Sequence, residues 1–402
     1  MSSIADATHQ VPRYLIVFFG ALVALGPLSM DAYLPAIPTM VEYFDSDIVS
    51  VNNTLAVFLI GYAVGQFFGG SLSDQVGRKP IGYIGLTVYI GTTFAMIFAA
   101  SVDQLLVLRF FQAIGGGFST VICMATVRDT YPVEELGRRF ATVTMIVLVA
   151  PLVAPTLGSL MLPFGWWTIF FFKATYATVL FVLYTRIVGE TRPGEWRNIS
   201  MVAVFKQCAG VITRRVGGRV LPIRYALAMA LSAASLMTFV TSASFVYMEY
   251  FGVSPGRFPL IFGLSVVGFM TMNLFSMHRL TTANAGRFFR AGLRIQVAGA
   301  AALVGVVLAG YTSIWTVVPL VIVTVSTLGL VGPAGSARFM AFFTQLAGSA
   351  SSVYTTLMFS LGGIAGLVVG RLFDGTLLPV VGVMLTASCL ANVIALTIPP
   401  RE

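Results

Sequence analysis

The sequence is short of charged residues. Only 10% of its 402 residues are Asp, Glu, Lys or Arg, whereas a typical soluble domain carries roughly 25%. Hydrophobic residues make up 57% of the chain, and its mean hydropathy is +0.90. This number of charged residues is too small to cover the surface of a protein in water. The composition therefore excludes an ordinary soluble domain and indicates that lipid is the main solvent.

Histidine and cysteine are scarce as well. The two histidines, His9 and His278, and the three cysteines, Cys123, Cys208 and Cys389, lie far apart in the chain. Metal sites need several such ligands close together, so we predict neither a metal site nor any other cofactor. The sequence also contains no Ser-His-Asp arrangement and no phosphate-binding loop, and we predict that the protein is not an enzyme.

The net charge of +9 does not indicate nucleic acid as a partner. Basic residues that bind nucleic acid gather on one soluble face, whereas here they stand in short loops between long apolar blocks. That distribution is typical of membrane proteins, whose cytoplasmic loops are rich in Lys and Arg. We therefore expect the lipid bilayer, and not nucleic acid, to surround the protein.

Long apolar blocks are the most abundant feature. Segments such as Tyr14–Met30 and Ile81–Ala100 reach or approach the roughly 20 residues that cross a bilayer. Their continuous apolar runs exclude the alternating pattern of a membrane β-barrel, and in lipid only helices then satisfy the backbone. The sequence predicts an all-α membrane protein with twelve transmembrane helices, at residues 14–37, 51–71, 81–101, 104–127, 139–162, 165–188, 219–247, 257–277, 291–310, 313–332, 349–370 and 378–398.

The longest polar stretch divides the chain into two halves. We predict a six-helix bundle at residues 1–188, a cytoplasmic linker at 189–218 and a second six-helix bundle at 219–402, with both termini in the cytoplasm. The opposite loops are acidic: they hold Glu42, Asp45, Asp47, Asp103, Glu249 and Asp374, with Arg257 and Arg371 as their basic residues. The predicted cytoplasmic loops hold Arg78, Lys79, Arg128, Arg138, Arg139, Arg192, Arg197, Lys206, Arg214, Arg215, Arg279, Arg287 and Arg290.

Two of the charged residues inside the predicted spans are candidates for function, because an ionisable group there costs on the order of 2.5–3.5 kcal/mol. Asp31 follows the apolar part of the first span, and Arg109 lies about five residues into the fourth. Counting 1.5 Å per residue, we expect both within roughly 8 Å of the outer boundary, facing one cavity. Our hypothesis is that Asp31 takes up a proton and that Arg109 is its electrostatic partner or a substrate anchor. The alternatives are a helix cap at Asp31 and an Arg109 that snorkels outward.

Other polar residues in the spans have less defined roles. We interpret Lys173 as a snorkelling side chain, Glu249 as an exposed cap and His278 as interfacial. Polar groups in membrane bundles often only bond across helices, but several are candidates for lining a substrate cavity, and we place Tyr33, Phe245 and Tyr247 at its mouth. The candidates are Tyr33, Asn53, Tyr62, Gln112, Phe245, Tyr247, Asn273 and Ser351.

Three motifs are similar to those of one family. Gly70–Pro80 (GSLSDQVGRKP), after the second span, and Leu108–Gly115 (LRFFQAIG), in the fourth, resemble the loop motif and the arginine motif of the major facilitator superfamily. Ala150–Gly158 (APLVAPTLG) resembles its antiporter motif, although alanines replace two frequent glycines. The resemblance implies two six-helix bundles that rock about a central cavity, with a latch on the cytoplasmic side. It assigns conformational gating to Gly70, Asp74, Gly77, Arg78, Arg128, Asp129, Pro151, Pro155 and Gly158.

A narrower resemblance is found in the first span. Leu28–Pro38 (LSMDAYLPAIP) is similar to the signature of the Bcr/CflA branch of drug:proton antiporters, and Arg128–Pro132 (RDTYP), Phe245–Tyr247 (FVY) and Ala347–Ser352 (AGSASS) add to the likeness. The branch implies a multi-pass protein of the bacterial inner membrane. In it, Asp31 and Arg109 match the membrane-embedded charged positions.

We therefore predict the proton-coupled export of a small amphiphilic molecule by alternating access, with protons as the coupling ion and the protein as a monomer. Three alternatives stay open at this stage. In the first, the exported substrate is an endogenous siderophore or metabolite. In the second, the protein is a proton-coupled importer of the same fold. In the third, it is a membrane protein that transports nothing. The sequence does not separate a drug from an endogenous product.

Overall fold

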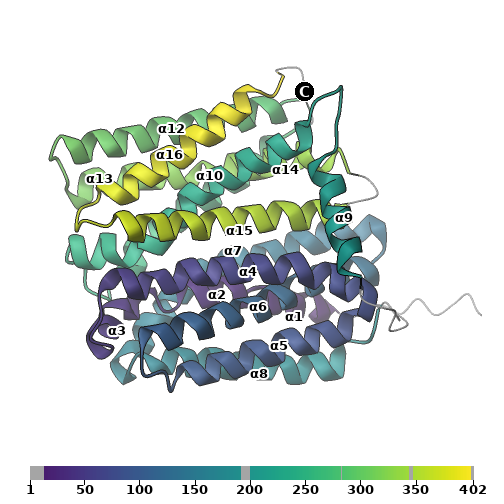
Figure 1. Cartoon of the computed structure of the whole chain (residues 1–402), viewed down its shortest axis with the longest axis horizontal. Helices are drawn as coiled ribbons and strands as arrows, with labels where there is room; N and C mark the ends of the chain where they lie inside the picture. Colours follow the sequence, from purple (N-terminus) through teal and green to yellow (C-terminus); the bar gives the residue numbers. More distant parts are fainter. Residues whose placement is uncertain (1–12, 192–199, 282, 344–346, 400–402) are drawn as a thin grey trace, which may run out of the picture.

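The computed structural model describes residues 13–191, 200–281, 283–343 and 347–399. Within these ranges the secondary structure is helical, and the only β-type pairing is an isolated bridge between Val216 and Arg219. The predicted all-α class is therefore confirmed. The helices run alongside one another, and those of the first and second halves of the chain form two neighbouring groups (Figure 1).

The helices follow the predicted spans closely. The first half comprises α1 (Arg13–Val23), α2 (Leu25–Asp31), η1 (Leu34–Ala36), α3 (Ile37–Tyr43), α4 (Ile48–Val76), α5 (Arg78–Met96), α6 (Val102–Thr130), α7 (Val133–Met161), η2 (Leu162–Phe164) and α8 (Trp167–Ile187). The second half comprises α10 (Leu221–Ser244), η3 (Phe245–Tyr250), α11 (Phe258–Arg279), α12 (Ala285–Leu308), α13 (Ile314–Ser326), α14 (Leu328–Met340), α15 (Ala347–Leu372) and α16 (Leu378–Leu396).

Among the described residues, eleven helical segments are long and apolar enough to cross a membrane. The predicted span that is missing from these eleven is the third, at residues 81–101, which corresponds to α5; this helix packs against α6 and α8 inside the first group. The helix begins with Arg78 and Lys79 and contains several Gly, Thr and Tyr residues, which lower its apolar character. Its place between two spanning helices supports its assignment to the bundle.

The first span is longer than predicted and is broken. It extends from Tyr14 to Tyr43 and consists of α1, α2, η1 and α3. Prolines explain the breaks, because a proline lacks the N–H that a helix requires: Pro27 follows the α1–α2 junction and Pro35 lies within η1. The predicted end at residue 37 was therefore too early. The tenth span was also predicted too short, since α13 and α14 together continue to Met340.

Glycines bring several helices into close contact. Gly61 and Gly65 of α4 lie directly against the backbone of α6, at Phe110 and Ile114. Gly363 of α15 lies in the same way against the backbone of Ala56 in α4, which joins the two halves of the chain. Small residues permit such approaches in membrane bundles, where packing replaces the hydrophobic effect between helices.

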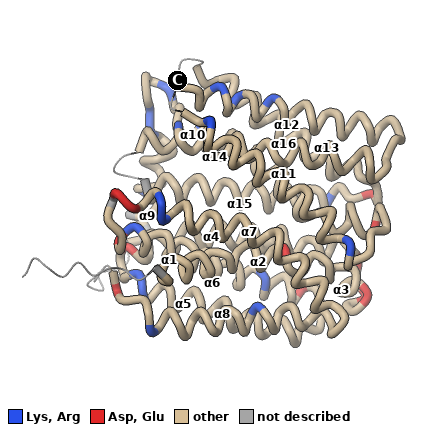
Figure 2. The backbone as a smooth tube through the Cα atoms, turned by 180° about the vertical axis from the view of Figure 1, so that it is seen from behind, with Lys and Arg blue, Asp and Glu red and all other residues tan. Residues whose placement is uncertain are grey.

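Charges gather at the two ends of the bundle (Figure 2). We call the end at which α1 begins and α16 ends the terminal face, and the other end the distal face. Most of the predicted cytoplasmic basic residues lie at the terminal face, and the acidic loops lie at the distal face. Arg192 and Arg197 lie outside the described residues. The charge asymmetry agrees with the predicted orientation, which stays a prediction.

The predicted linker contains a helix, α9 (Met201–Ile212), that lies across the terminal face (Figure 1). Its Val204, Cys208 and Val211 side chains are buried. It touches both halves of the chain: the Phe205 ring packs on Phe67 of α4 at 5.7 Å between centroids, and α9 also contacts α10 and α15. The α9 part of the linker is thus packed against both halves.

Candidate functional site

Arg109 is fully buried in the first group of helices. Its Nη1 donates to the carbonyl oxygen of Ser29 at 3.0 Å and to Oε1 of Gln112 at 2.9 Å. Its guanidinium lies over the Tyr33 ring, 4.0 Å from the centroid, and 5.1 Å from the centroid of Phe58. Such cation–π contacts stabilise a charge that has left water. The alternative of an outward-snorkelling Arg109 is wrong.

Two predicted cavity residues are fixed beside Arg109. Gln112 donates from Nε2 to Oγ1 of Thr93 at 2.7 Å, which orients its amide so that the oxygen faces the guanidinium. The Tyr33 hydroxyl is hydrogen-bonded to Thr54. Both side chains are buried, so they form part of the wall around Arg109 and do not lie at an open cavity mouth.

Asp31 is the last residue of α2 and is only 5% exposed. Neither Asp31 nor Arg109 takes part in any of the ion pairs within 4.0 Å that the described residues form. The predicted pair is thus not formed here. Arg109 instead binds the Ser29 carbonyl in the last turn of α2, where backbone oxygens lack helical partners and the helix dipole favours a cation.

The depth predicted for Asp31 also needs correction. The first span continues beyond it through η1 and α3 to Tyr43. Asp31 therefore lies in the interior of the span and not near its outer end. Asp31 is the last residue of α2, so its position is also the one that the helix-cap alternative expects.

Lys173 of α8 also belongs to this site, although it was interpreted from the sequence as a snorkelling side chain. Its side chain is fully buried, and its Nζ lies 4.2 Å from the Phe170 ring centroid and 5.6 Å from that of Tyr33. Snorkelling is therefore wrong, since the ammonium points at the rings that surround Arg109. A signal in the sequence was available, because Lys173 follows Phe170 by one helical turn and both then face the core.

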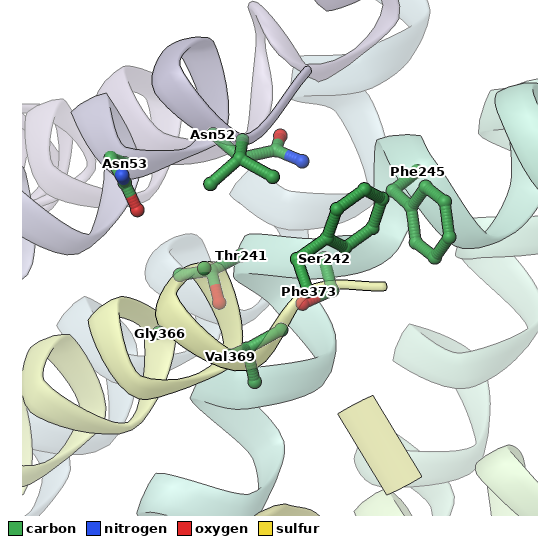
Figure 3. A pocket seen from close by; sticks show the side chains of 10 residues that line it. Asn52, Asn53, Thr241, Ser242, Phe245, Gly366, Val369 and Phe373 are labelled. Atoms are coloured by element: carbon green, nitrogen blue, oxygen red, sulfur yellow. The ribbon is translucent and has the colours of Figure 1, made fainter. Parts of the chain in front are cut away.

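Asn53 and Phe245 lie together elsewhere, at the distal end of the contact between the two halves. They line a pocket of about 20 Å³, together with Asn52, Thr241 and other side chains (Figure 3). A pocket of that size holds about one water molecule, whereas small-molecule sites measure roughly 300–1,000 Å³. In this conformation the pair is part of a closed contact.

The remaining predicted cavity residues are dispersed. The Tyr62 hydroxyl is hydrogen-bonded to Thr120 at 2.7 Å, and its ring meets Phe359 of the second half at 4.8 Å between centroids. Tyr247 is fully buried within the second half. Asn273 is half-buried on α11, and Ser351 is exposed on α15. These residues do not form one cavity with Arg109 in this state.

The distal ends of the two halves are in contact. Ser244 Oγ donates to the carbonyl oxygen of Leu34 at 2.8 Å, and Ser159 Oγ donates to that of Pro255 at 2.7 Å. Phe245, which we had placed at a cavity mouth, is only 3% exposed. The structure therefore represents a state that is closed on the distal side.

The predicted gate residues meet at the terminal face. Arg78 is buried, and its Nη2 lies 2.7 Å from Oδ1 of Asp74 while its Nε lies 3.0 Å from Oδ2 of Asp129. Arg128 approaches the other oxygen of Asp129 at 3.6 Å. Gly77 permits the turn between α4 and α5, because its φ of 112° is one that L-residues with a side chain rarely adopt.

Glu190 belongs to the same cluster and was not predicted. Its carboxylate accepts hydrogen bonds from the backbone N–H groups of Arg78 and Lys79, both at 2.9 Å. An acid at a helix N-terminus satisfies free N–H groups and opposes the helix dipole. Glu190 comes 112 residues after Arg78 in sequence, so only the fold reveals this partnership.

The proline motif lies on α7, which remains one helix through Pro151 and Pro155. Gly158 follows, and a Cβ there would overlap the carbonyl oxygen of Ala32. Ala32 is the residue directly after Asp31. The motif thus packs against the segment that carries the candidate proton site.

Solved structures with the same fold are transporters. The chain resembles a D-xylose-proton symporter with a TM-score of 0.74 at 12% identity, covering 97% of this chain and 99% of the other. It resembles the human organic anion transporter MFSD10 with a TM-score of 0.69 at 15% identity, covering 96% and 98%. At these identities the likeness establishes the fold alone.

Sequence relatives include bacterial resistance proteins. A bicyclomycin resistance protein homolog of Haemophilus influenzae is 28% identical over 378 residues, which is 92% of each chain. Multidrug resistance protein MdtL of Salmonella typhi is 28% identical over 71% of this chain and 73% of its own length. These relatives agree with the resemblance to the Bcr/CflA branch. The model of the Major Facilitator Superfamily matches residues 17–367, and the chain is therefore a multi-pass membrane transporter of that superfamily.

Proposed function

We propose that this transporter exports a small amphiphilic, drug-like molecule across the bacterial inner membrane in exchange for protons. The names of the relatives support a foreign drug as cargo, because they refer to bicyclomycin and multidrug resistance. The proposal places the terminal face in the cytoplasm, in agreement with its basic residues. It treats the protein as a monomer that consists of two bundles, residues 1–188 and 219–402, joined by the linker.

The single observation that carries the proposal is the burial of two oppositely charged residue types at one short segment, α2: one is part of it and the other binds to it. Asp31 ends α2, and Arg109 binds the carbonyl oxygen of Ser29 in the same turn. Arg109 keeps its charge at any physiological pH. Asp31 is therefore the group of the two whose charge changes.

Coupling follows from competition for Asp31. A carboxylate buried without a partner is costly, and either a proton or a polar group of the substrate removes that cost. Proton and substrate then stabilise different states of the same site, which is the condition for exchange. Substrate loads from the cytoplasmic side, and a proton that arrives from outside displaces it and resets the site.

The test uses purified protein in liposomes with an acidic lumen and a pH-sensitive dye inside. Chloramphenicol, bicyclomycin, ethidium and tetraphenylphosphonium are added outside in turn. We expect at least one of them to accumulate while protons leave, and the Asp31→Asn variant to lose this accumulation. Asp103→Asn, the same substitution at an exposed residue, serves as the control and retains it.

Full gradient-driven accumulation by Asp31→Asn would refute the role of Asp31. Direction is tested in membrane vesicles, because export predicts uptake into inside-out vesicles with an acidic interior. Uptake by right-side-out vesicles along an inward proton gradient would instead identify a proton-coupled importer.

A further inference from the structure

Building on the proposed function, we propose that Lys173 is a second cationic partner of Asp31. In the state that follows proton release, the Asp31 carboxylate binds Lys173 and Arg109 together. Lys173 is then a positioning residue for the coupling step, because it sets how readily Asp31 gives up its proton.

The first argument is a set of buried donors without acceptors. Nζ of Lys173 and both Nε and Nη2 of Arg109 have no hydrogen-bond partner among the described residues. Both side chains have no solvent exposure. Buried donors in native proteins are nearly always satisfied, and leaving them unsatisfied is costly. The three donors surround the rings of Tyr33 and Phe170. Together they indicate a position at which an anion binds.

The second argument is that both cations face the same rings. The Tyr33 centroid lies 4.0 Å from Cζ of Arg109 and 5.6 Å from Nζ of Lys173. The Phe170 centroid lies 5.8 Å and 4.2 Å from the same two atoms. The two charges are therefore less than about 10 Å apart in a dry interior, where their repulsion is strong. A carboxylate that reaches both of them would relieve it.

The third argument identifies the anion. Asp31 is the one carboxyl group that is buried in the part of the chain that the structure describes. It precedes Tyr33, whose ring contacts both cations, by two residues. The other titratable groups at this site are tyrosines: Tyr89 of α5 is hydrogen-bonded to Ser29, and Tyr176 of α8 donates to the carbonyl oxygen of Ala21. The charged residues of α5 and α7 stand in their first two turns, at the terminal face.

The segment that carries Asp31 is a short piece of an interrupted span. The α2 helix has only seven residues; Ala24 separates it from α1, and a turn and the short helix η1 separate it from α3. Pro27 and Pro35 lie next to these junctions, and prolines are the usual cause of a kink. A rotation of α2 about its axis would turn the Asp31 side chain toward Arg109 without unfolding either neighbour.

Infrared titration of the purified protein tests the inference without any substrate. The protonated carboxyl band that disappears in Asp31→Asn reports the proton on Asp31. In Lys173→Gln we expect the midpoint of that band to rise by about one pH unit, a tenfold tighter hold on the proton, because the carboxylate has lost a cation that stabilises it. Lys173→Arg keeps the charge and restores the wild-type midpoint.

Lys206→Gln, the same change at an exposed lysine of α9, leaves the midpoint where it is in the wild type. An unchanged midpoint in Lys173→Gln would overturn the inference, as would a wild-type protein that has no band dependent on Asp31. Because the titration measures proton binding alone, its failure is distinct from the failure of export, which the liposome assay measures.

Discussion

Gln112 and Arg109 lie one turn apart on α6, and the amide of Gln112 connects the arginine to a neighbouring helix. Its oxygen accepts from Arg109 at 2.9 Å while its nitrogen donates to Thr93 of α5 at 2.7 Å. An uncharged amide offers both an acceptor and a donor. Gln112 thus holds the guanidinium in place without neutralising it.

Replacing Gln112 by Glu supplies the counter-charge that the site lacks. We expect Gln112→Glu to bind Arg109 permanently as an ion pair and to reduce proton-coupled transport at least tenfold, which corresponds to about 1.4 kcal/mol of coupling. Transport rates in liposomes measure the effect. Gln112→Met, which removes the hydrogen bonds without adding charge, is expected to be less severe, and equal activity of Gln112→Glu and the wild type would contradict the proposed role.

Arg78 connects three elements at the terminal face through Asp74, Asp129 and Ser73. Removing it leaves two carboxylates without their buried partner. We expect Arg78→Ala to lower the free energy of unfolding by about 2 kcal/mol, below the value for fully buried pairs because both acids are partly exposed. The free energy of unfolding of Arg78→Lys is expected to lie between those of the wild type and Arg78→Ala, because an ammonium does not reproduce the two-pronged hydrogen bonding of a guanidinium. Thermal unfolding in detergent measures both.

A double-mutant cycle isolates the Arg78–Asp129 contact in that network. Asp129→Ala in the Arg78→Ala background is expected to cost less than Asp129→Ala alone, because its partner is already missing. Strictly additive losses would show that the two residues contribute independently, and the gate interpretation of the cluster would lose its physical basis.

A substitution at Gly158 tests how tightly α7 packs against the segment that follows Asp31. A Cβ at this position would overlap the Ala32 carbonyl oxygen, whereas a Cβ at Gly382 of α16 meets nothing within 4 Å. We expect Gly158→Ala to destabilise the protein by about 1–3 kcal/mol through overpacking. Gly382→Ala, the same change in another spanning helix, is expected to be neutral or stabilising by about 0.5–1 kcal/mol. Equal melting temperatures for the two variants would contradict this packing.

The sequence predicted most of the fold because lipid imposes simple requirements. Helix positions follow from apolar length, and eleven of the spans are recovered as long apolar helices. The errors fall where proline breaks a span: the extension to Tyr43 and the depth of Asp31 both follow from helix segments that resume after a proline. Hydropathy alone does not distinguish a span that ends from one that bends.

The site was harder to predict than the fold, because the partners of a side chain depend on the direction in which it points. Arg109 was predicted as a buried charge. Its observed partner is the backbone carbonyl of Ser29 and not the side chain of Asp31, which depends on where α2 ends. Lys173 was assigned to the surface because a long stem permits snorkelling, which burial in the structure rules out. Glu190 had no local signal, since its partners are the N–H groups of a helix more than a hundred residues earlier.

Alternating access requires the distal contacts between the two halves to open. Asn53 of α4 and Gly370 of α15 meet at this end, where a Cβ on Gly370 would lie 2.7 Å from Oδ1 of Asn53. With the three native cysteines replaced by serine, we expect the pair Asn53→Cys and Gly370→Cys to form a disulfide that stops transport. A reducing agent then restores transport, which excludes a defect in folding.

A matched pair within the second half controls for the presence of a cross-link. Thr241 of α10 and Gly366 of α15 lie close together, because a Cβ on Gly366 would be 3.2 Å from Oγ1 of Thr241, and both belong to the bundle that is proposed to move as one body. A disulfide between Thr241→Cys and Gly366→Cys is therefore expected to form and to leave most of the transport activity intact. If the link between Asn53→Cys and Gly370→Cys forms to completion and transport continues at its full rate, the two halves do not separate at the distal face. Exchange would then have to proceed by a motion other than rocking, because the distal side would never open.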